Sequence, residues 1–414
     1  MQFINSILSP NQACPKECPE FLKRLRREYP REEQWDRYVG GKLHEIRTIE
    51  RELQMEAQAL EMSKATTVSS LGALSSPGIQ FPTSTAPSSL HAYSSMAATA
   101  GLNLELNRYM DILPYDRTRV HLSEEASRLT SLVSPVLQGR VSDYINASWV
   151  SFPGRWWIAT QAPLPHSLDR FWYMVSDQDI KIIVNLTPSI EKGHVKAHPY
   201  WPTEDNPILE YEGGLMVHHI SSSPFPRAPK DITVRNLKII RPIYPTTPTI
   251  PPSSPLRASM TRGMQGDTKQ GEDGSMYEER LITVLHYHTW PDHGVPKEPA
   301  NSVLHLLDEL EVLSPAETVS KSPEEILTPP ILVHCSAGCG RTGTLCVLDA
   351  ILRLLRSPQS NEAVEEMKNL DPIVSLVERA RAARPQMVQS VTQLHFIYNV
   401  VKDYYTSPRD TFSE

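Results

Sequence analysis

Short apolar runs alternate with segments of helical spacing from about residue 102 to residue 405. Residues 180–186 (IKIIVNL) and 331–333 (ILV) are almost entirely apolar, which predicts buried strands. Residues 343–356 and 375–383 repeat apolar positions at steps of three and four, which predicts helices. Strands and helices interleaved in this way predict an α/β class fold: a single domain, residues 101–406, with a twisted mixed sheet flanked by helices.

The N-terminal part, residues 1–62, is predicted to be a charged helical extension. Residues 21–62 are densely charged, and apolar side chains recur on one side of the expected helix at Ile46, Ile49, Leu53, Ala57 and Leu60. We expect the helix to be interrupted at Gly40 and Gly41. An apolar face this short favours packing of the helix on its own domain over formation of a coiled-coil dimer, and the sequence allows both arrangements.

Two further stretches have compositions that disfavour a packed core. Residues 63–100 hold one formal charge, Lys64, among small and hydroxylic side chains, which predicts a flexible linker. Residues 242–255 contain six prolines in fourteen positions, so an irregular Pro/Ser-rich insertion is expected at about 242–276. The flanking segments, 231–241 and 279–290, alternate like strands, so the insertion is expected to replace a hairpin turn. Residues 407–414 are assigned to a C-terminal tail.

Charge and cysteine usage narrow the class of protein. The formal charge of −7 argues against general binding to nucleic acid or to an anionic membrane. The five cysteines are an odd number and suggest a reducing compartment rather than a disulfide framework. No apolar run approaches the length of a membrane span, and the first residues do not resemble a signal peptide. We therefore expect a cytoplasmic protein, with the nucleus as an alternative.

The stretch ILVHCSAGCGRTGTLCVLDAILRLL (331–355) predicts a strand, a glycine-rich turn and a helix. Cys335 would sit where the N–H groups of the turn and of the helix N-terminus converge, an arrangement that binds anions and lowers a thiol pKa. Arg341 offers a planar fork for two phosphoryl oxygens. Arg341 stands where the nucleotide-binding motif GxxxxGK[ST] requires lysine, so that motif is excluded. Cys339 and Cys346, taken alone, suit buried structural roles.

HCSAGCGRT (334–342) matches HCxxGxxR[ST], the signature of cysteine-dependent protein tyrosine phosphatases, and is similar to the loop of non-receptor, PEST-type members. The resemblance covers about residues 102–405. It includes NRYMDILPYDRTRV, DYINASWV, IATQAPLP, IEKGHVK, PYWP, TWPDHGVP and QSVTQLHFIY, in the order of the family. It implies the tyrosine phosphatase fold and a metal-independent, cofactor-free enzyme that acts on phosphotyrosine in proteins during signal transduction.

The resemblance also implies roles for individual residues. The catalytic set would be Cys335 as nucleophile, Arg341 as phosphate clamp, Asp292 as general acid and base, Gln389 for positioning water, and Thr342 and His334 supporting the loop. Tyr109 would stack on the substrate ring and Asp111 would hold the peptide backbone. Substrate binding would also involve Glu191, Lys196, Gln393 and the loop residues Ser336, Ala337, Gly338, Cys339 and Gly340.

Two other functions would use the same fold. A phosphotyrosine-binding module without catalysis would lack the acid, the nucleophile or the arginine, but Asp292, Cys335 and Arg341 are present. A phosphatase for serine, threonine or lipid phosphate would be expected to lack the loop around Tyr109. The expected partners are phosphotyrosine proteins, and a regulatory partner or kinase could act on the Pro/Ser-rich segments, where Thr247 and Ser254 each precede proline.

Overall fold

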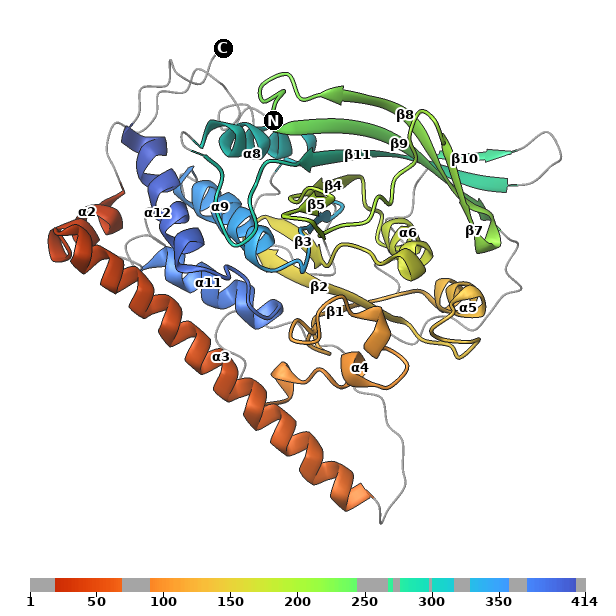
Figure 1. Ribbon diagram of the computed structural model, residues 1–414, viewed down its shortest axis with the longest axis horizontal. Helices are drawn as coiled ribbons and strands as arrows, with labels where there is room; N and C mark the ends of the chain where they lie inside the picture. Colours follow the sequence, from red (N-terminus) through yellow and green to blue (C-terminus); the bar gives the residue numbers. More distant parts are fainter. Residues whose placement is uncertain are drawn as a thin grey trace.

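A mixed β-sheet forms the centre of the computed structural model, which describes residues 19–68, 90–243, 267–270, 276–297, 300–315, 328–356 and 371–406 (Figure 1). The strand order is β1-β2-β3-β12-β4-β11-β9-β8-β7, and β10 pairs with β11. The neighbours β3, β12, β4 and β11 are parallel, whereas the other pairs are antiparallel. The strands are β1 (Arg119–His121), β2 (Tyr144–Phe152), β3 (Arg155–Thr160), β4 (Ile182–Asn185), β7 (Ile208–Tyr211), β8 (Leu215–Pro224), β9 (Ile232–Ile243), β10 (Asp267–Gln270), β11 (Met276–Tyr287) and β12 (Ile331–His334).

Helices cover both faces of the sheet because its central strands are apolar on both sides. Side chains alternate across a strand, so Val333 of β12 joins the core beneath one group of helices, whereas Leu332 joins the core on the other face. The first group is α8 (Asn301–Leu313), α9 (Gly340–Arg356), α11 (Pro372–Ala383) and α12 (Val391–Thr406); the second is α5 (Glu124–Val133) and α6 (Leu168–Asp177). This confirms the predicted α/β class with a mixed sheet flanked by helices.

The N-terminal segment forms α2 (Glu20–Glu28) and α3 (Glu32–Val68), which are separated at Pro30. The expected interruption at Gly40 and Gly41 was wrong, because α3 is continuous there. Each of the two glycines destabilises a helix by about 1 kcal/mol relative to alanine, but packing on α11 and α12 stabilises α3. The buried side chains of α3 include Trp35, Val39, Leu43, Ile46 and Ala57.

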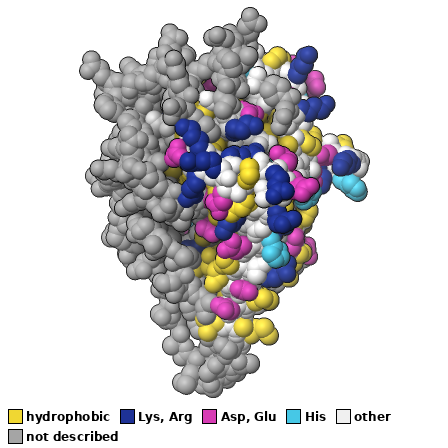
Figure 2. All heavy atoms as spheres, turned by 90° about the vertical axis from the view of Figure 1, so that its left-hand side faces the viewer, with side chains coloured by type: hydrophobic (Ala, Val, Ile, Leu, Met, Phe, Trp, Pro, Cys, Tyr) yellow, Lys and Arg dark blue, Asp and Glu magenta, His cyan; other side chains and the backbone are white. Residues whose placement is uncertain are grey.

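The predicted apolar stripe of α3 was only partly right. Ile46 is buried, but Ile49 is 46% exposed, because the buried face runs from Trp35 through Val39 and Leu43 to Ile46 and then to Glu50. α3 thus docks on its own domain. Figure 2 views this side of the molecule, where cationic and anionic side chains are interspersed over the outer surface.

Parts of the predicted linker and insertion have regular structure. Residues 63–68 continue α3, and residues 90–99 contain η1 (Leu90–Tyr93) and α4 (Met96–Thr99). Tyr93 and Ala98 are buried, and the Asp116 carboxylate accepts hydrogen bonds from the N–H groups of Met96 and Ala97, at 2.8 and 2.9 Å. The expectation of a linker over the whole of 63–100 was therefore wrong at both ends, because α3 extends to Val68 and because Asp116, distant in the chain, holds the segment that contains α4. Residues 69–89 lie outside the described residues.

The insertion joins two paired strands. β9 reaches Ile243, opposite Met276 of β11, and residues 267–270 pair with β11 as β10. The irregular insertion is thus shorter than 242–276, because main-chain pairing with a long neighbouring strand does not require apolar side chains. Residues 244–266 and 271–275, and the tail 407–414, lie outside the described residues. Among the helices of the described segments, we find none that combines the length and apolar character needed to span a bilayer.

Candidate active site

The glycine-rich loop connects the C-terminal end of β12 to α9, which begins at Gly340. Close packing requires two glycines, Gly338 in the loop and Gly343 in the first turn of α9. Gly338 has a φ of +71°, and a Cβ there would lie 2.0 Å from the carbonyl oxygen of Thr160. A Cβ at Gly343 would lie 2.4 Å from the backbone nitrogen of Val388. The loop therefore packs tightly on β3, and the start of α9 packs tightly on the segment that precedes α12.

Cys335 lies at the end of β12, with only 4% of its surface exposed. Burial alone would raise the pKa of its thiol, but the Arg341 charge, the Thr342 hydroxyl and the N–H groups of Thr342 and Cys339 together hold the pKa below its usual value. By contrast, burial raises the pKa of Cys339 and of Cys346 well above the ordinary range. Cys335 is therefore the cysteine of the loop that is disposed to be a thiolate.

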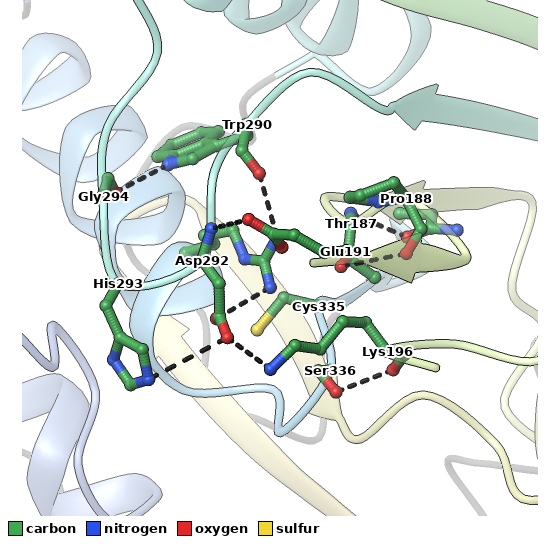
Figure 3. Close-up of polar contacts among 12 residues, drawn as sticks. Thr187, Pro188, Glu191, Lys196, Trp290, Asp292, His293, Gly294, Cys335 and Ser336 are labelled. Atoms are coloured by element: carbon green, nitrogen blue, oxygen red, sulfur yellow. Dashed lines mark hydrogen bonds and ion pairs between the residues drawn. The ribbon is translucent and has the colours of Figure 1, made fainter. Parts of the chain in front are cut away.

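The Arg341 guanidinium is buried beside Cys335 and is held by three partners. It donates to the carbonyl oxygen of Trp290 at 2.9 Å, and it pairs with Asp292 Oδ1 at 2.9 Å and with Glu191 Oε2 at 3.5 Å. Glu191 comes from the hairpin of β5 (Ile190–Glu191) and β6 (His194–Val195), and its Oε1 accepts the N–H of Asp292 at 2.7 Å. Glu191 thus orients both the guanidinium and the loop that carries Asp292 (Figure 3).

The carboxylate of Asp292 points into the site and lies between two cations (Figure 3). Its Oδ2 accepts from Lys196 Nζ at 2.6 Å, and its Oδ1 contacts Arg341. Partial burial acts to raise the pKa of Asp292, but the bond to Lys196 and the charge of Arg341 outweigh burial and lower it. Asp292 is therefore held at the cavity and stabilised as a carboxylate.

Tyr109 contributes one wall of the cavity. Its hydroxyl lies 2.9 Å from Ser336 Oγ, which in turn donates to the carbonyl oxygen of Lys196 at 2.7 Å. The cavity has a volume of about 220 Å³. Its lining includes Tyr109, Asp111, Lys196, Asp292, Cys335, Ser336, Ala337, Cys339, Gly340, Arg341, Gln389 and Gln393. Most of the residues expected from the sequence therefore meet in one cavity.

Four expected residues lie behind the lining instead. Gly338 shapes the loop and Glu191 orients Arg341, as described above. Buried His334 contacts the Tyr200 hydroxyl through Nε2 at 2.7 Å and the Cys335 carbonyl oxygen through Nδ1 at 2.9 Å, and burial lowers its pKa to about 4. The buried Thr342 hydroxyl acts on the Cys335 thiol and has no other hydrogen-bond partner within the described segments.

Gln389 precedes α12 and lines the cavity beside Gly340. Its Nε2 donates to Gln386 Oε1 at 3.1 Å, and its N–H donates to Gln393 Oε1 at 2.8 Å. Ser390, the next residue, donates from Oγ to the carbonyl oxygen of His293, at 2.9 Å. The glutamine segment and the loop of Asp292 are therefore linked directly by a hydrogen bond.

The sequence did not single out two buried arginines that support these loops. Arg384 donates to the carbonyl oxygens of Gly338 and Ala337, at 2.8 and 2.9 Å, and to Asn146 Oδ1 at 2.7 Å. Arg381 donates to the carbonyl oxygens of Met387 and Val388, at 2.8 and 2.9 Å. The only signal in the sequence was a pair of arginines at the end of a helix that leads into the glutamine segment, and such a pair usually lies on a solvated face.

The geometry suits attack on a phosphoryl group. A low-pKa thiol, a buried guanidinium and turn N–H groups converge on one point, and a carboxyl group lines the same cavity. Among the described residues, no group of three or more His, Cys, Asp or Glu side chains could hold a metal ion. The fold and this cavity define a class: α/β proteins with a cysteine at an anion-binding loop after a central parallel strand.

The family model for protein-tyrosine phosphatases matches residues 103–403, so the chain belongs to the protein-tyrosine phosphatase family. It is 33% identical over 317 residues to human receptor-type tyrosine-protein phosphatase H, covering 75% of this chain and 22% of that protein. It is 31% identical over 319 residues to human tyrosine-protein phosphatase non-receptor type 18, covering 76% of this chain and 54% of that protein. The chain thus spans from about a fifth to about half of the length of these relatives.

Solved structures give the same assignment. A structure described as PTPN18 in complex with HER2 phosphopeptides is 25% identical, covers 94% of this chain and 99% of its own, and has a TM-score of 0.59. A second PTPN18 structure, which addresses distinct HER2 tyrosine phosphorylation sites, is 29% identical, covers 76% and 88%, and has a TM-score of 0.53. These similarities confirm the predicted tyrosine phosphatase fold.

Proposed function

We propose that the chain hydrolyses phosphotyrosine in proteins in two steps, through a phosphocysteine intermediate. The observation that carries this proposal is the convergence of the Cys335 thiol, the Arg341 guanidinium and the Asp292 carboxyl group on one cavity. Membership of the protein-tyrosine phosphatase family supports it. The roles of the individual residues are those that the family resemblance implies, and the charges and contacts of these groups are compatible with them.

In the first step, the Cys335 thiolate attacks phosphorus and the bond from phosphorus to the tyrosine oxygen breaks. Arg341 holds two of the three non-bridging phosphoryl oxygens while charge develops on them, and the loop N–H groups also bind the non-bridging oxygens. Asp292, protonated once the phosphate dianion has entered between it and the cations, gives its proton to the departing phenolate oxygen. The products are tyrosine and an S-phosphorylated cysteine.

In the second step, a water molecule attacks phosphorus and the sulfur–phosphorus bond breaks. Asp292, now a carboxylate, takes the proton from water, and Gln389 with Gln393 positions that water at the mouth of the cavity. The Thr342 hydroxyl stabilises the returning thiolate. Inorganic phosphate leaves, and Cys335 is restored.

The shape of the cavity favours tyrosine over serine as the phosphate carrier. Tyr109 forms a wall above a floor made by Cys335 and Arg341, so the phosphate must hang from a long, flat arm to reach the thiol. The PTPN18 structures hold HER2 phosphopeptides, which supports a phosphotyrosine protein substrate here. Met110, beside Tyr109, is 59% exposed and uncharged, so this position gives no preference for acidic flanking residues.

The mechanism is tested by two substitutions with a matched control. Cys335→Ser should abolish turnover of a phosphotyrosine peptide, whereas Asp292→Ala should lower kcat by about 100-fold or more and still bind the peptide. Cys346→Ala changes a buried cysteine outside the cavity and should keep the wild-type rate. Turnover by Cys335→Ser at the wild-type rate would contradict the mechanism.

The same assay separates the alternative functions. A phosphotyrosine-binding module would bind the peptide without releasing phosphate, and a broad-specificity phosphatase would act equally on phosphoserine. We further propose that the protein acts in the cytoplasm, with the nucleus as an alternative. The Pro/Ser-rich insertion is proposed as a site for a regulatory partner or kinase, and Thr247 and Ser254 within it lie outside the described residues.

A further inference from the structure

The segment that carries Gln389 has an unusual backbone. Gln386 has a φ of +58° and Val388 a φ of +60°, in the left-handed region that non-glycine residues rarely adopt. For Val388 the conformation is especially unfavourable, because its side chain is branched at Cβ. Contacts from the surrounding structure must therefore hold the segment in place.

Arg381 and Glu50 make these contacts together. Arg381, which is 3% exposed, donates to the carbonyl oxygens of Met387 and Val388. Its third donor, Nη1, pairs with Glu50 Oε2 at 2.6 Å. The other carboxylate oxygen of Glu50 accepts the N–H of Gln386 at 3.0 Å. One carboxylate thus binds the segment directly and also orients the guanidinium that binds it.

Glu50 belongs to α3, which lies outside the region matched by the family model. It is 8% exposed, and it also accepts from the Tyr115 hydroxyl at 3.4 Å. One helical turn earlier, on the exposed side of α3, the Arg47 guanidinium donates to the carbonyl oxygen of Gln389 itself. The N-terminal helix therefore touches the glutamine segment at both of its ends.

We propose that Glu50 is a positioning residue for the second chemical step: through Arg381 and the Gln386 N–H it holds Gln389 where the attacking water must be oriented. The inference rests on the proposed function. It makes α3 a working part of the active site rather than a separate extension, although Glu50 touches neither substrate nor the reacting atoms.

The two chemical steps should depend on Glu50 to different degrees. Cys335 and Arg341 are held by other residues, namely Arg384 at the loop carbonyls and Glu191 at the guanidinium. The glutamine segment reaches the cysteine loop through the N–H of Val388, which donates to the carbonyl oxygen of Cys339 at 3.3 Å. Loss of Glu50 should therefore slow hydrolysis of the phosphocysteine far more than its formation.

The test is stopped-flow release of p-nitrophenol from p-nitrophenyl phosphate, together with steady-state kinetics, for the full chain and its Glu50→Gln variant. Glu50→Gln keeps the shape of the side chain but removes the charge that pairs with Arg381. We expect kcat to fall about tenfold while kcat/KM changes less than about threefold, and a burst approaching one equivalent of p-nitrophenol to appear. The burst measures accumulated phosphocysteine, which general damage to the fold would not produce.

Two further variants complete the experiment. Tyr38→Phe removes a different hydrogen bond from the same helix, to Asp371 Oδ2 at 2.7 Å, and should leave kcat and the burst as in wild type. Arg47→Met alters an exposed position, so it provides the test if Glu50→Gln does not fold, and kcat should fall about two- to threefold with a smaller burst. Unchanged kcat without a burst, or an equal fall in kcat and kcat/KM, would overturn the inference. A wild-type chain that releases no product would instead overturn the proposed function.

Discussion

A side chain at Gly338 should lower both the stability of the protein and its activity. Its φ of +71° disfavours any L side chain, and a Cβ would lie 2.0 Å from the Thr160 carbonyl oxygen. Gly139 is a matched control, because its φ is +79° and a Cβ there would meet nothing within 4 Å. Gly139→Ala should therefore report the cost of the backbone conformation alone, about 1–2 kcal/mol of unfolding free energy.

Gly338→Ala adds a steric conflict to that cost. Ordinary van der Waals contact of a Cβ begins at 3.4 Å, so the loop must move by about 1.4 Å away from Thr160 in β3. The loop carries Cys335 at one end and precedes Arg341 at the other, and misplacement by about 1 Å can cost about 100-fold in rate. We expect kcat/KM to fall by about 100-fold. The unfolding free energy should fall by about 1–3 kcal/mol more than in Gly139→Ala, as it does for an overpacked core.

The assays are urea unfolding and steady-state hydrolysis of a phosphotyrosine peptide by both alanine variants. Gly139→Ala should keep wild-type kcat/KM, because Gly139 lies in a loop away from the cavity lining. If Gly338→Ala matched Gly139→Ala in both stability and kcat/KM, the close approach to Thr160 would not be constraining the loop. That result would refute the steric reasoning.

Three other predictions concern the cavity. Tyr109→Ala should lower kcat/KM on phosphotyrosine peptides about tenfold or more, since aromatic pairs add about 0.5–1.5 kcal/mol beyond area burial. Tyr109→Phe keeps the ring and should lower kcat/KM less. Equal wild-type rates on phosphoserine and phosphotyrosine peptides would contradict tyrosine specificity. Lys196→Met removes the cation that most lowers the pKa of Asp292, so the pKa of Asp292 should rise. The alkaline limb of the plot of kcat/KM against pH should therefore move to higher pH. An alkaline limb that does not move would show that Asp292 is not the general acid. Peroxide should inactivate the enzyme reversibly at Cys335. Cys339→Ser should not change how fast added thiol restores activity, because burial raises the pKa of the Cys339 thiol and keeps it protonated. Slower recovery of activity in this variant would make Cys339 a resolving thiol.

Some features were determined by the sequence alone because their signals are local. A continuous apolar run predicts a doubly buried strand; β4 lies within the expected segment 180–186, and β12 covers the expected segment 331–333 and extends one residue beyond it. The cysteine, glycines and arginine of 334–342 are close in the chain, so their spacing fixes how a strand, a tight turn and a helix can surround an anion. The expected site residues on other segments could be named only by resemblance, one motif at a time.

Other features depended on contacts between distant segments, which local patterns do not contain. The stripe of α3 was misassigned around Ile49 because Glu50 is buried, and its partners lie on distant segments, among them Arg381, more than 300 residues away. Likewise, composition could not show that residues 90–99 pack beneath Asp116 or that residues 267–270 pair with β11. Whether a charged side chain is buried, or a segment pairs as a strand, depends on the residues that it contacts. Those residues are distant in the sequence and come close only when the chain folds.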